Sequence, residues 1–450
     1  MDKQRIEIEN EILDKLSGKI YLMQDLVGKK DVIFNVFLEV YNSPKCKDFI
    51  KKSKGIELDS FFNEFFSYGI IEEFLNDPGV EDIMINSLAP IYIHKAKEGM
   101  VKTKKRFTSK EDLDLFIKKL VVFSGRQKIS KINNIMLSGI KGRVNIVYSP
   151  FGPQITITRA KKRPLSIIDL IKAGGLTPEL AGQFWLYVEG LGVKPANIII
   201  SGGPGSGKTT FLNALFSFIP QTDRVVIIED ALELNTEVEK NFSRLESDEE
   251  LSMENLVKNS LRMRPDRIIV GEVRGAEAKD LMTAMNIGKY CMGTVHASTA
   301  RETIMRLNNV PMNVPEVLLN LVDVFVIMRR YNIKNSVFRL VGELVETAGM
   351  EKKTVLLSLL CSYELSNKRF ETTSVSSVYR DRLAEVSGQS PREIQDEIGV
   401  RASILQALLE NDILDMQEVS DICHRYIIDP QGLLKELKIN RENLLKDKGR

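Results

Sequence analysis

The chain has 450 residues, of which 43% are apolar and 28% charged, and 63 basic residues are balanced by 61 acidic ones. These values are ordinary for a globular protein of about two to four domains. The near-zero net charge excludes nucleic acid or membrane binding through overall charge, so any such contact needs a local patch. The four cysteines are far apart, which argues against a disulfide scaffold or a zinc module and suits a reducing cytoplasm.

The N-terminal segment carries charged residues throughout. Residues 1–20 contain no apolar core of a signal peptide, and nowhere do 18 apolar residues follow one another, so no membrane-spanning helix is expected. Up to about residue 75 the apolar residues follow helical spacing, as Ile8, Ile12 and Leu16 do. We therefore expect a helical extension over 1–75.

The next segment, 76–160, reads as a small α+β domain. A hairpin is expected around Gly99, followed by a helix with Ser109 as N-cap and Asp112 at its third position. Two strands, "GRVNIVYS" and "QITITRA", then flank the turn "PFGP". The polar, proline-containing stretch 161–166 is the best candidate for a linker, and lead-in helices are expected up to 195.

From 196 to 335 short apolar strands alternate with amphipathic helices, which predicts a parallel sheet covered on both faces. The region 336–450 is expected to be first strand and then mainly helical. Its clearest element begins at Ser390, with Pro391 next and Glu393 at the third position, a capping box with the favoured proline.

A phosphate-binding loop follows the strand "ANIIIS". Residues 202–209, "GGPGSGKT", fit G-x-x-x-x-G-K-[ST] between a predicted strand and a predicted helix. Glycines let successive N–H groups turn toward phosphates, Lys208 neutralises the β- and γ-phosphates, and the Thr209 hydroxyl ligates Mg²⁺. The expected ligands are ATP and Mg²⁺. The expected nucleotide-binding residues are Gly202, Gly203, Pro204, Gly205, Ser206, Gly207, Lys208, Thr209 and Thr210.

Carboxylates stand at the ends of two later strands. Glu229 and Asp230 end "RVVIIED", Glu233 follows, and Glu272 ends "RIIVGE". Because the carboxyl ends of parallel strands meet at one edge of the sheet, these acids should lie beside the loop, where one can hold the Mg²⁺ shell and another polarise a water. His296 in "GTVHAST" ends the fourth predicted strand at the same edge, in a position to sense the γ-phosphate.

Four motifs in this order carry a resemblance: "GGPGSGKTT", "IEDALEL", "LRMRPDRIIVGEVRG" and "GTVHASTA". They resemble the secretion-ATPase superfamily, the hexameric motors of type II and type IV secretion, type IV pili and the archaellum, over residues from about 80 to 335. The tail "SPREIQDEIGVRASILQALLEN" is similar to that of archaeal members. The resemblance implies a RecA-like P-loop domain preceded by the α+β domain.

The resemblance also implies roles for the strand-end residues. Glu233 would activate the attacking water, Glu229 and Asp230 would orient it and the metal, and Glu272 would lie near Mg²⁺. His296 would be the His-box histidine. The implied metal ligands are Thr209, Asp230 and Glu272.

Arginines of the N-terminal domain close over the nucleotide in this superfamily, and Arg143 and Arg159 match them. The implied assembly is a cytoplasmic homohexamer, held at the membrane by a polytopic platform protein, that moves pilin-like or secreted substrates. Two departures stand out: Gly288-Lys289 replaces the common Gly-His, and the four-cysteine zinc module of many bacterial members is absent.

Three other classes stay open from the residues. A nucleic-acid motor would need a basic, aromatic-bearing loop, and "KKRPLS" and "VKTKKR" are short, so nucleic acid is not the expected partner. A small-molecule kinase would carry a lid in place of the "GEVRG" and "TVHAS" blocks. A non-hydrolysing scaffold tends to lose a residue such as Lys208, Glu233 or Glu272, all of which are present.

Overall fold

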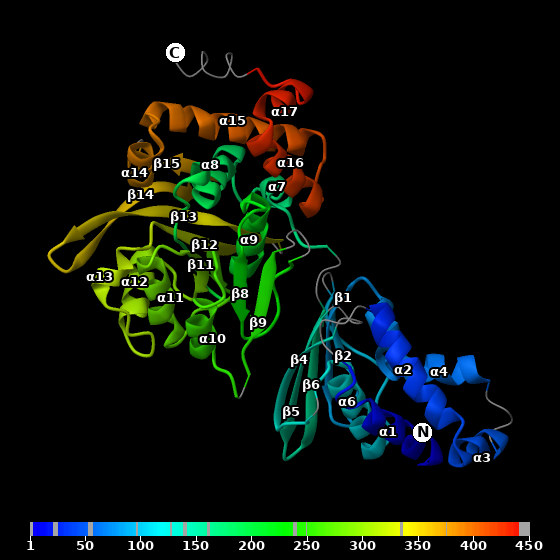
Figure 1. The fold of residues 1–450 in the computed structure, drawn as a ribbon. Helices are drawn as coiled ribbons and strands as arrows, with labels where there is room; N and C mark the ends of the chain where they lie inside the picture. The colour runs from blue at the N-terminus through cyan, green and yellow to red at the C-terminus, as the bar shows by residue number, and fades with distance from the viewer. Residues whose placement is uncertain are drawn as a thin grey trace. The chain divides into compact units, whose positions relative to one another are not determined.

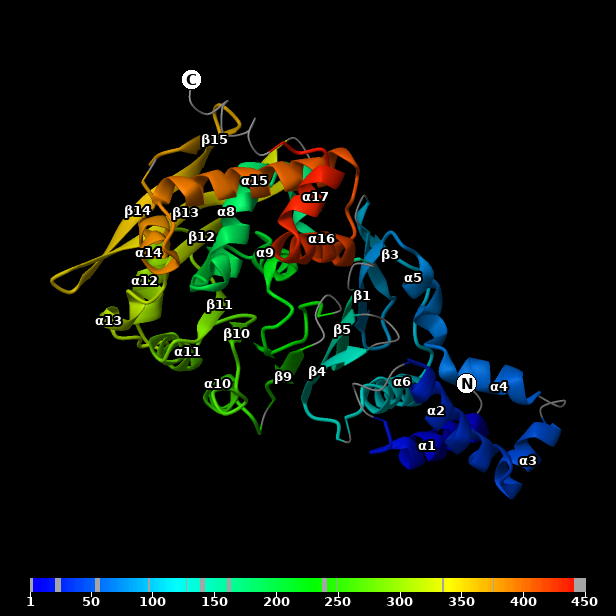
Figure 2. The same ribbon diagram turned by 45° about the horizontal axis from the view of Figure 1, so that its top comes forward.

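The chain divides into two compact units, Met1–Lys162 and Arg163–Arg450, here called the N-terminal and the C-terminal unit. The computed structural model describes residues 3–20, 26–52, 57–95, 98–126, 128–137, 142–159, 163–236, 241–248, 250–333, 336–374 and 376–440. Figure 1 shows both units as ribbons, and Figure 2 shows them turned by 45°. Each unit has its own sheet.

The N-terminal unit packs helices against one face of an antiparallel sheet. Its strands lie in the order β3-β2-β1-β6-β5-β4, and the helices and the sheet share one apolar core. The predicted N-cap bond is present, since the Ser109 hydroxyl accepts from the Asp112 backbone N–H. The elements are α1 (Lys3–Leu16), α2 (Leu26–Tyr41), α3 (Pro44–Lys52), α4 (Leu58–Phe66), the 3₁₀ turn Gly69–Ile71, α5 (Glu72–Asn76), β1 (Val80–Asn86), β2 (Tyr92–Lys95), β3 (Gly99–Lys102), α6 (Lys110–Phe123), β4 (Ile132–Leu137), β5 (Gly142–Ser149) and β6 (Gly152–Arg159).

The C-terminal unit is built on a nine-stranded sheet in the order β15-β14-β13-β12-β7-β11-β10-β8-β9. The strands from β12 to β9 run parallel, and β13, β14 and β15 extend the sheet antiparallel. The strands are β7 (Ile198–Gly202), β8 (Val225–Glu229), β9 (Phe242–Glu246), β10 (Arg267–Val270), β11 (Tyr290–Val295), β12 (Val324–Ile333), β13 (Ser336–Glu351), β14 (Thr354–Glu364) and β15 (Arg369–Thr372).

Two apolar cores sandwich this sheet. Along β7, Ile198 and Ile200 belong to one core and Ile199 to the other, as the period of two in a strand requires. The first core takes in α7, α8, α9 and α14–α17, and the second takes in α10–α13 (Figure 1). The helices are α7 (Ile167–Lys172), α8 (Pro178–Glu189), α9 (Lys208–Ala214), α10 (Met253–Ser260), α11 (Glu277–Asn286), α12 (Ala300–Asn308), α13 (Glu316–Leu319), α14 (Val378–Ser387), α15 (Pro391–Glu410), α16 (Met416–Ile428) and α17 (Pro430–Glu436), with 3₁₀ turns at Gly190–Gly192 and Leu215–Phe218.

The predicted fold class is confirmed: a RecA-like parallel core, with β7 between β11 and β12, follows a smaller α+β region and precedes a mainly helical tail. The capping box at Ser390 and Glu393 is present. Strands β1, β4, β9 and β12 add to the predicted set. The finer five-part division of the chain stays a prediction, and residues 161 and 162 of the predicted linker lie outside the described residues. Within the described part, no helix is long and apolar enough to cross a bilayer.

Candidate nucleotide site

The glycine loop joins β7 to α9, and its backbone explains its composition. Gly205 and Gly207 have φ of 66° and 95°, in the left-handed region that favours glycine. Gly202 is required for a different reason, since a Cβ there would lie 2.4 Å from the Ser206 hydroxyl and 2.6 Å from the Met328 carbonyl oxygen. The Ser206 hydroxyl is buried and has no hydrogen-bond partner among the described residues. The loop is thus a tight backbone cradle of the kind that phosphates fill.

Lys208 begins α9 and turns back into the loop. Its Nζ donates to the carbonyl oxygens of Gly202 and Gly203, at 3.1 and 3.2 Å, and lies 3.3 Å from His296 Nδ1. Burial lowers the pKa of Lys208, while the charges of Glu272 and Glu233 act in the opposite direction. An ammonium group is therefore held at the mouth of the loop by weak, exchangeable contacts.

His296 links this ammonium to the carboxylate after β10. Its Nε2 lies 3.3 Å from Glu272 Oε1, and Lys208, which can only donate, faces Nδ1. The ring therefore carries its proton on Nε2, directed at Glu272. Burial, followed by the charge of Lys208, lowers the pKa of His296. The edge of the parallel sheet brings Lys208, His296 and Glu272 together, as their places at the ends of β7, β11 and β10 predict.

The buried carboxylate of Glu229 shapes the loop that follows β8. Its Oε1 accepts from the backbone N–H groups of Glu233 and Leu234, at 2.8 and 2.9 Å, and its Oε2 pairs with Arg244 at 2.9 Å. A Cβ on Gly271 would lie 3.1 Å from Glu229 Cγ, so that glycine makes room for the side chain. Glu229 is thus committed to holding the segment that carries the exposed Glu233.

Asp230 and the remaining loop residues are less enclosed. Asp230 Oδ2 pairs with Arg274 Nη2 at 2.8 Å on the half-exposed side of the loop. Thr209 is half-buried, and Pro204 and Thr210 are exposed. Asp230 would therefore have to release Arg274 in order to bind a metal ion.

The two predicted arginines belong to the N-terminal unit. Arg143 on β5 pairs with Thr158, and Arg159 on β6 follows Thr158, so the pleat directs the two arginines to opposite faces of the sheet. Arg143 is exposed. Arg159 Nη1 donates to the carbonyl oxygens of Asp77 and Val80, at 2.5 and 2.9 Å. The second arginine is thus engaged within its own unit.

Residues outside the predicted motifs complete the site. Arg306 Nη1 donates to the His296 carbonyl oxygen at 2.8 Å, and its charge adds to burial in lowering the pKa of both Lys208 and His296. The Thr303 hydroxyl, on the same helix α12, donates a hydrogen bond to the Ser201 hydroxyl at 2.8 Å. Ser201 lies just before the loop. The sequence predicts the start of α12, because Thr299 caps it. No local sequence pattern predicts that Arg306 turns toward the loop.

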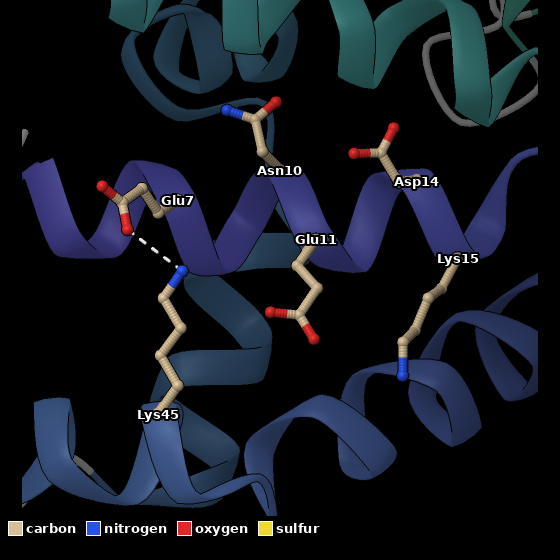
Figure 3. Close-up of a pocket in the computed structure, with 6 residues that line it drawn as sticks. All are labelled: Glu7, Asn10, Glu11, Asp14, Lys15 and Lys45. Carbon is tan, nitrogen blue, oxygen red and sulfur yellow. Dashed lines mark ion pairs between the residues drawn. The ribbon is translucent and has the colours of Figure 1, made fainter.

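A polar hollow of the N-terminal unit has a different character. Figure 3 shows it along α1, where Glu7 pairs with Lys45 at 3.0 Å. Asp14, another residue of its lining, pairs with Lys118 at 2.8 Å. Two acids of this face, Glu7 and Asp14, are paired with lysines, so we assign it to solvated ion pairs. The lining residues are Glu7, Asn10, Glu11, Asp14, Lys15 and Lys45.

Comparison with known proteins shows the family of this chain. Residues 68–354 match the model of the family described as Type II/IV secretion system protein. The uncharacterized protein MJ0900 of Methanocaldococcus jannaschii is 29% identical over 93% of this chain and 77% of its own length. The conjugal transfer protein TrbB of Rhizobium radiobacter is 36% identical over 37% of this chain and 52% of its own. The solved structure of the pilus retraction motor PilT with bound ADP is 17% identical and covers 78% of this chain and 95% of that one, with a TM-score of 0.48. The chain belongs to the Type II/IV secretion system protein family.

Proposed function

We propose that the C-terminal unit binds ATP and hydrolyses it to ADP and phosphate. The observation that carries the proposal is the run of contacts from Lys208 through His296 to Glu272 at the mouth of a glycine loop. Lys208 would leave the Gly202 and Gly203 carbonyl oxygens for the β- and γ-phosphates, whose charge it neutralises. His296 would turn its Nε2–H from Glu272 to a γ-phosphate oxygen and donate to it.

The oxygen atoms present suit Mg²⁺. Hydroxyl and carboxylate oxygens are the ligands that this hard cation prefers, and Thr209, Glu272 and Asp230 supply them. Glu272 is part-exposed, with His296 as its neighbour. When bound, Mg²⁺ would offset the negative charge on the phosphate oxygens.

Glu233 is our candidate for the general base. Its backbone N–H is fixed by the buried Glu229, while its side chain is exposed on the loop. Water would attack the γ-phosphorus and pass a proton to the Glu233 carboxylate. The bond from the γ-phosphorus to the bridging oxygen would break, with the electron pair leaving on ADP.

We further propose that hydrolysis drives a motor. Membership of the Type II/IV secretion system protein family supports a motor function. The similarity to a relative named for conjugal transfer supports it too. The working form would be a cytoplasmic homohexamer held peripherally at the membrane by a polytopic platform protein, acting on pilin-like or secreted substrates. Arg143 and Arg159 would close over the nucleotide as arginine fingers, and Arg159 would first have to release Asp77 and Val80.

The deciding experiment measures the mass in solution with and without ATP and Mg²⁺, together with phosphate release. A six-subunit species that hydrolyses ATP is expected. A monomer or dimer that consumes ATP only when a small acceptor is added would instead mark a kinase. Hydrolysis that needs DNA and weakens with salt would mark a nucleic-acid motor.

A further inference from the structure

The hairpin of β12 and β13 places two arginines directly opposite each other. β12 pairs with the loop strand β7, with Met328 beside Gly202, and then runs on past the end of β7. In the antiparallel register of the hairpin, Arg330 faces Arg339. This end of the hairpin lies beside the start of α9 (Figure 1). A pair of guanidinium groups is thus carried to the glycine loop by the same chain.

Both side chains lie against the loop. Arg339 Nε donates to the Gly205 carbonyl oxygen at 2.9 Å. A Cβ on Gly205 would lie 3.0 Å from Arg330 Nη1, and one on Gly207 would lie 3.5 Å from Arg339 Cδ. The carbonyl and the next N–H of a trans peptide point in opposite directions. Arg339 therefore turns the Ser206 N–H away from the hairpin, toward the Gly203 carbonyl oxygen that Lys208 also contacts.

The charges of this pair have no ionic partner among the residues that the structure describes. Like charges directly opposite each other on two strands repel, and neither Arg330 nor Arg339 has an ion-pair partner in the described part of the chain. The neighbouring Arg329 differs, because it pairs with Glu343 across the same hairpin. Two adjacent, exposed guanidinium groups beside a phosphate cradle have the geometry and charge to bind an anion with several oxygens.

We propose that Arg330 and Arg339 form an intrachain phosphate-binding wall of the nucleotide site. Arg339 Nε holds the loop through Gly205. Its two terminal nitrogens and the guanidinium of Arg330 then bind oxygens of the polyphosphate of a nucleoside di- or triphosphate. This inference rests on the proposed nucleotide binding, and it adds a cationic group that is separate from Lys208.

The test is ADP binding by calorimetry at two salt concentrations, on the full chain. Arg330→Gln and Arg339→Gln should each raise the Kd for ADP about tenfold or more, the loss of one charge-assisted hydrogen bond. They should also flatten the salt dependence of binding, because each removes an ion pair with the phosphates. Arg329→Gln is the matched control, with the same charge change on the same hairpin, and it should bind ADP as the parent does.

Several outcomes would overturn the proposal. Parent-like ADP binding by both variants would do so, as would equal weakening by Arg329→Gln, or weakening with an unchanged salt dependence. Arg330 has no ion pair among the described residues that folding would need, so its variant remains a fair test if Arg339→Gln unfolds at a lower temperature. Lys208→Ala separates the two hypotheses. If it too leaves ADP binding intact, the nucleotide site itself is wrong, whereas if it alone abolishes binding, only the hairpin proposal fails.

Discussion

Two lysines, one in each unit, are equally buried, and only one of them belongs to the candidate site. Lys119 on α6 and Lys208 on α9 are each 7% exposed. Burial lowers the pKa of both. Both bind backbone carbonyl oxygens, Lys119 that of Ser67 at 3.2 Å and Lys208 that of Gly202 at 3.1 Å. Burial of a cation and its backbone contacts therefore do not identify a site.

The surroundings separate the two lysines. Lys119 Nζ lies 5.0 Å from the centre of the Phe65 ring, and the nearby Glu9 is already paired with Arg5 at 2.8 Å. Lys208 lies in a loop of left-handed glycines, with the charge of Glu272 within reach. A backbone cradle and carboxylates at the ends of sheet strands thus mark a phosphate site, while a cation that packs on an aromatic ring marks a core.

Removal of Lys208 is the strongest test of this difference between the two lysines. Lys208→Ala should lower ATP hydrolysis by about a hundred- to a thousandfold, because the site no longer holds a preorganised cation at the phosphates. Its thermal midpoint should change little, since in the described part of the chain the Lys208 ammonium contacts loop carbonyl oxygens and a histidine ring. Phosphate release and thermal unfolding measure the two effects. Hydrolysis at the parent rate would remove Lys208 from the site.

Glu233→Gln tests the base while leaving the cradle intact. ADP and ATP binding should persist, and turnover should fall by about a hundredfold or more, as for loss of a general base. Glu229→Gln is the informative partner, because it should also lower the free energy of unfolding by about 1–3 kcal/mol through weaker hydrogen bonds to the loop. If Glu233→Gln turns over normally, the role of base passes to Glu229 or Glu272.

Local signals in the sequence predict much of the C-terminal unit. The loop, its flanking strand and helix, and the shared edge of Glu272 and His296 follow from motif and strand order. The half-buried, polar edge strand β9 has no such apolar signal. The arginines Arg306 and Arg339 reach the loop only through tertiary packing of α12 and β13, so no spacing rule could place them beside it.

The N-terminal unit also contains candidate site residues whose contacts could not be predicted from the sequence. The resemblance implies one role for Arg143 and Arg159, yet the structure gives Arg159 two carbonyl contacts and leaves Arg143 exposed. A residue type at a motif position does not reveal whether its hydrogen bonds are already used. The two arginines should therefore respond differently to the same substitution.

Arg143→Gln should lower ATP hydrolysis by about a hundredfold or more, as expected for an arginine finger, with a smaller loss of stability than Arg159→Gln because Arg143 is exposed. Arg159→Gln should lower ATP hydrolysis as well, and it should also lower the free energy of unfolding by about 1–3 kcal/mol, because two backbone acceptors lose a charged donor. Hydrolysis and denaturant unfolding distinguish the two. Hydrolysis at the parent rate in either variant would remove that arginine from the site. Equal free energies of unfolding in both variants would show that the two carbonyl contacts of Arg159 do not stabilise the fold.

The smallest effect is expected at Lys119, and it is a dependence on pH. Its pKa in the folded chain is lowered by burial, then raised by Glu9, lowered by Arg5 and raised by Glu72 in smaller measure, with a net shift below the ordinary 10.5. Between the lowered value and 10.5 the unfolded chain holds this proton more tightly than the folded one. The contribution of Lys119 to the free energy of unfolding therefore rises as the pH rises through that window, by at most about 1.4 kcal/mol per pH unit.

Lys119→Met removes the titration while keeping an unbranched apolar side chain on the Phe65 ring. ATP hydrolysis should match the parent, and the difference in unfolding free energy between parent and variant should shift in favour of the parent as pH rises toward 10.5. Denaturant unfolding at several alkaline pH values measures it, and the difference between the two chains cancels the titration of exposed lysines. A difference that does not change with pH would mean that Lys119 titrates alike in both states, so that its burial carries no cost for the charge. A fall in hydrolysis would mean that Lys119 and the lysine of the candidate site, Lys208, are not separable in the way their surroundings indicate.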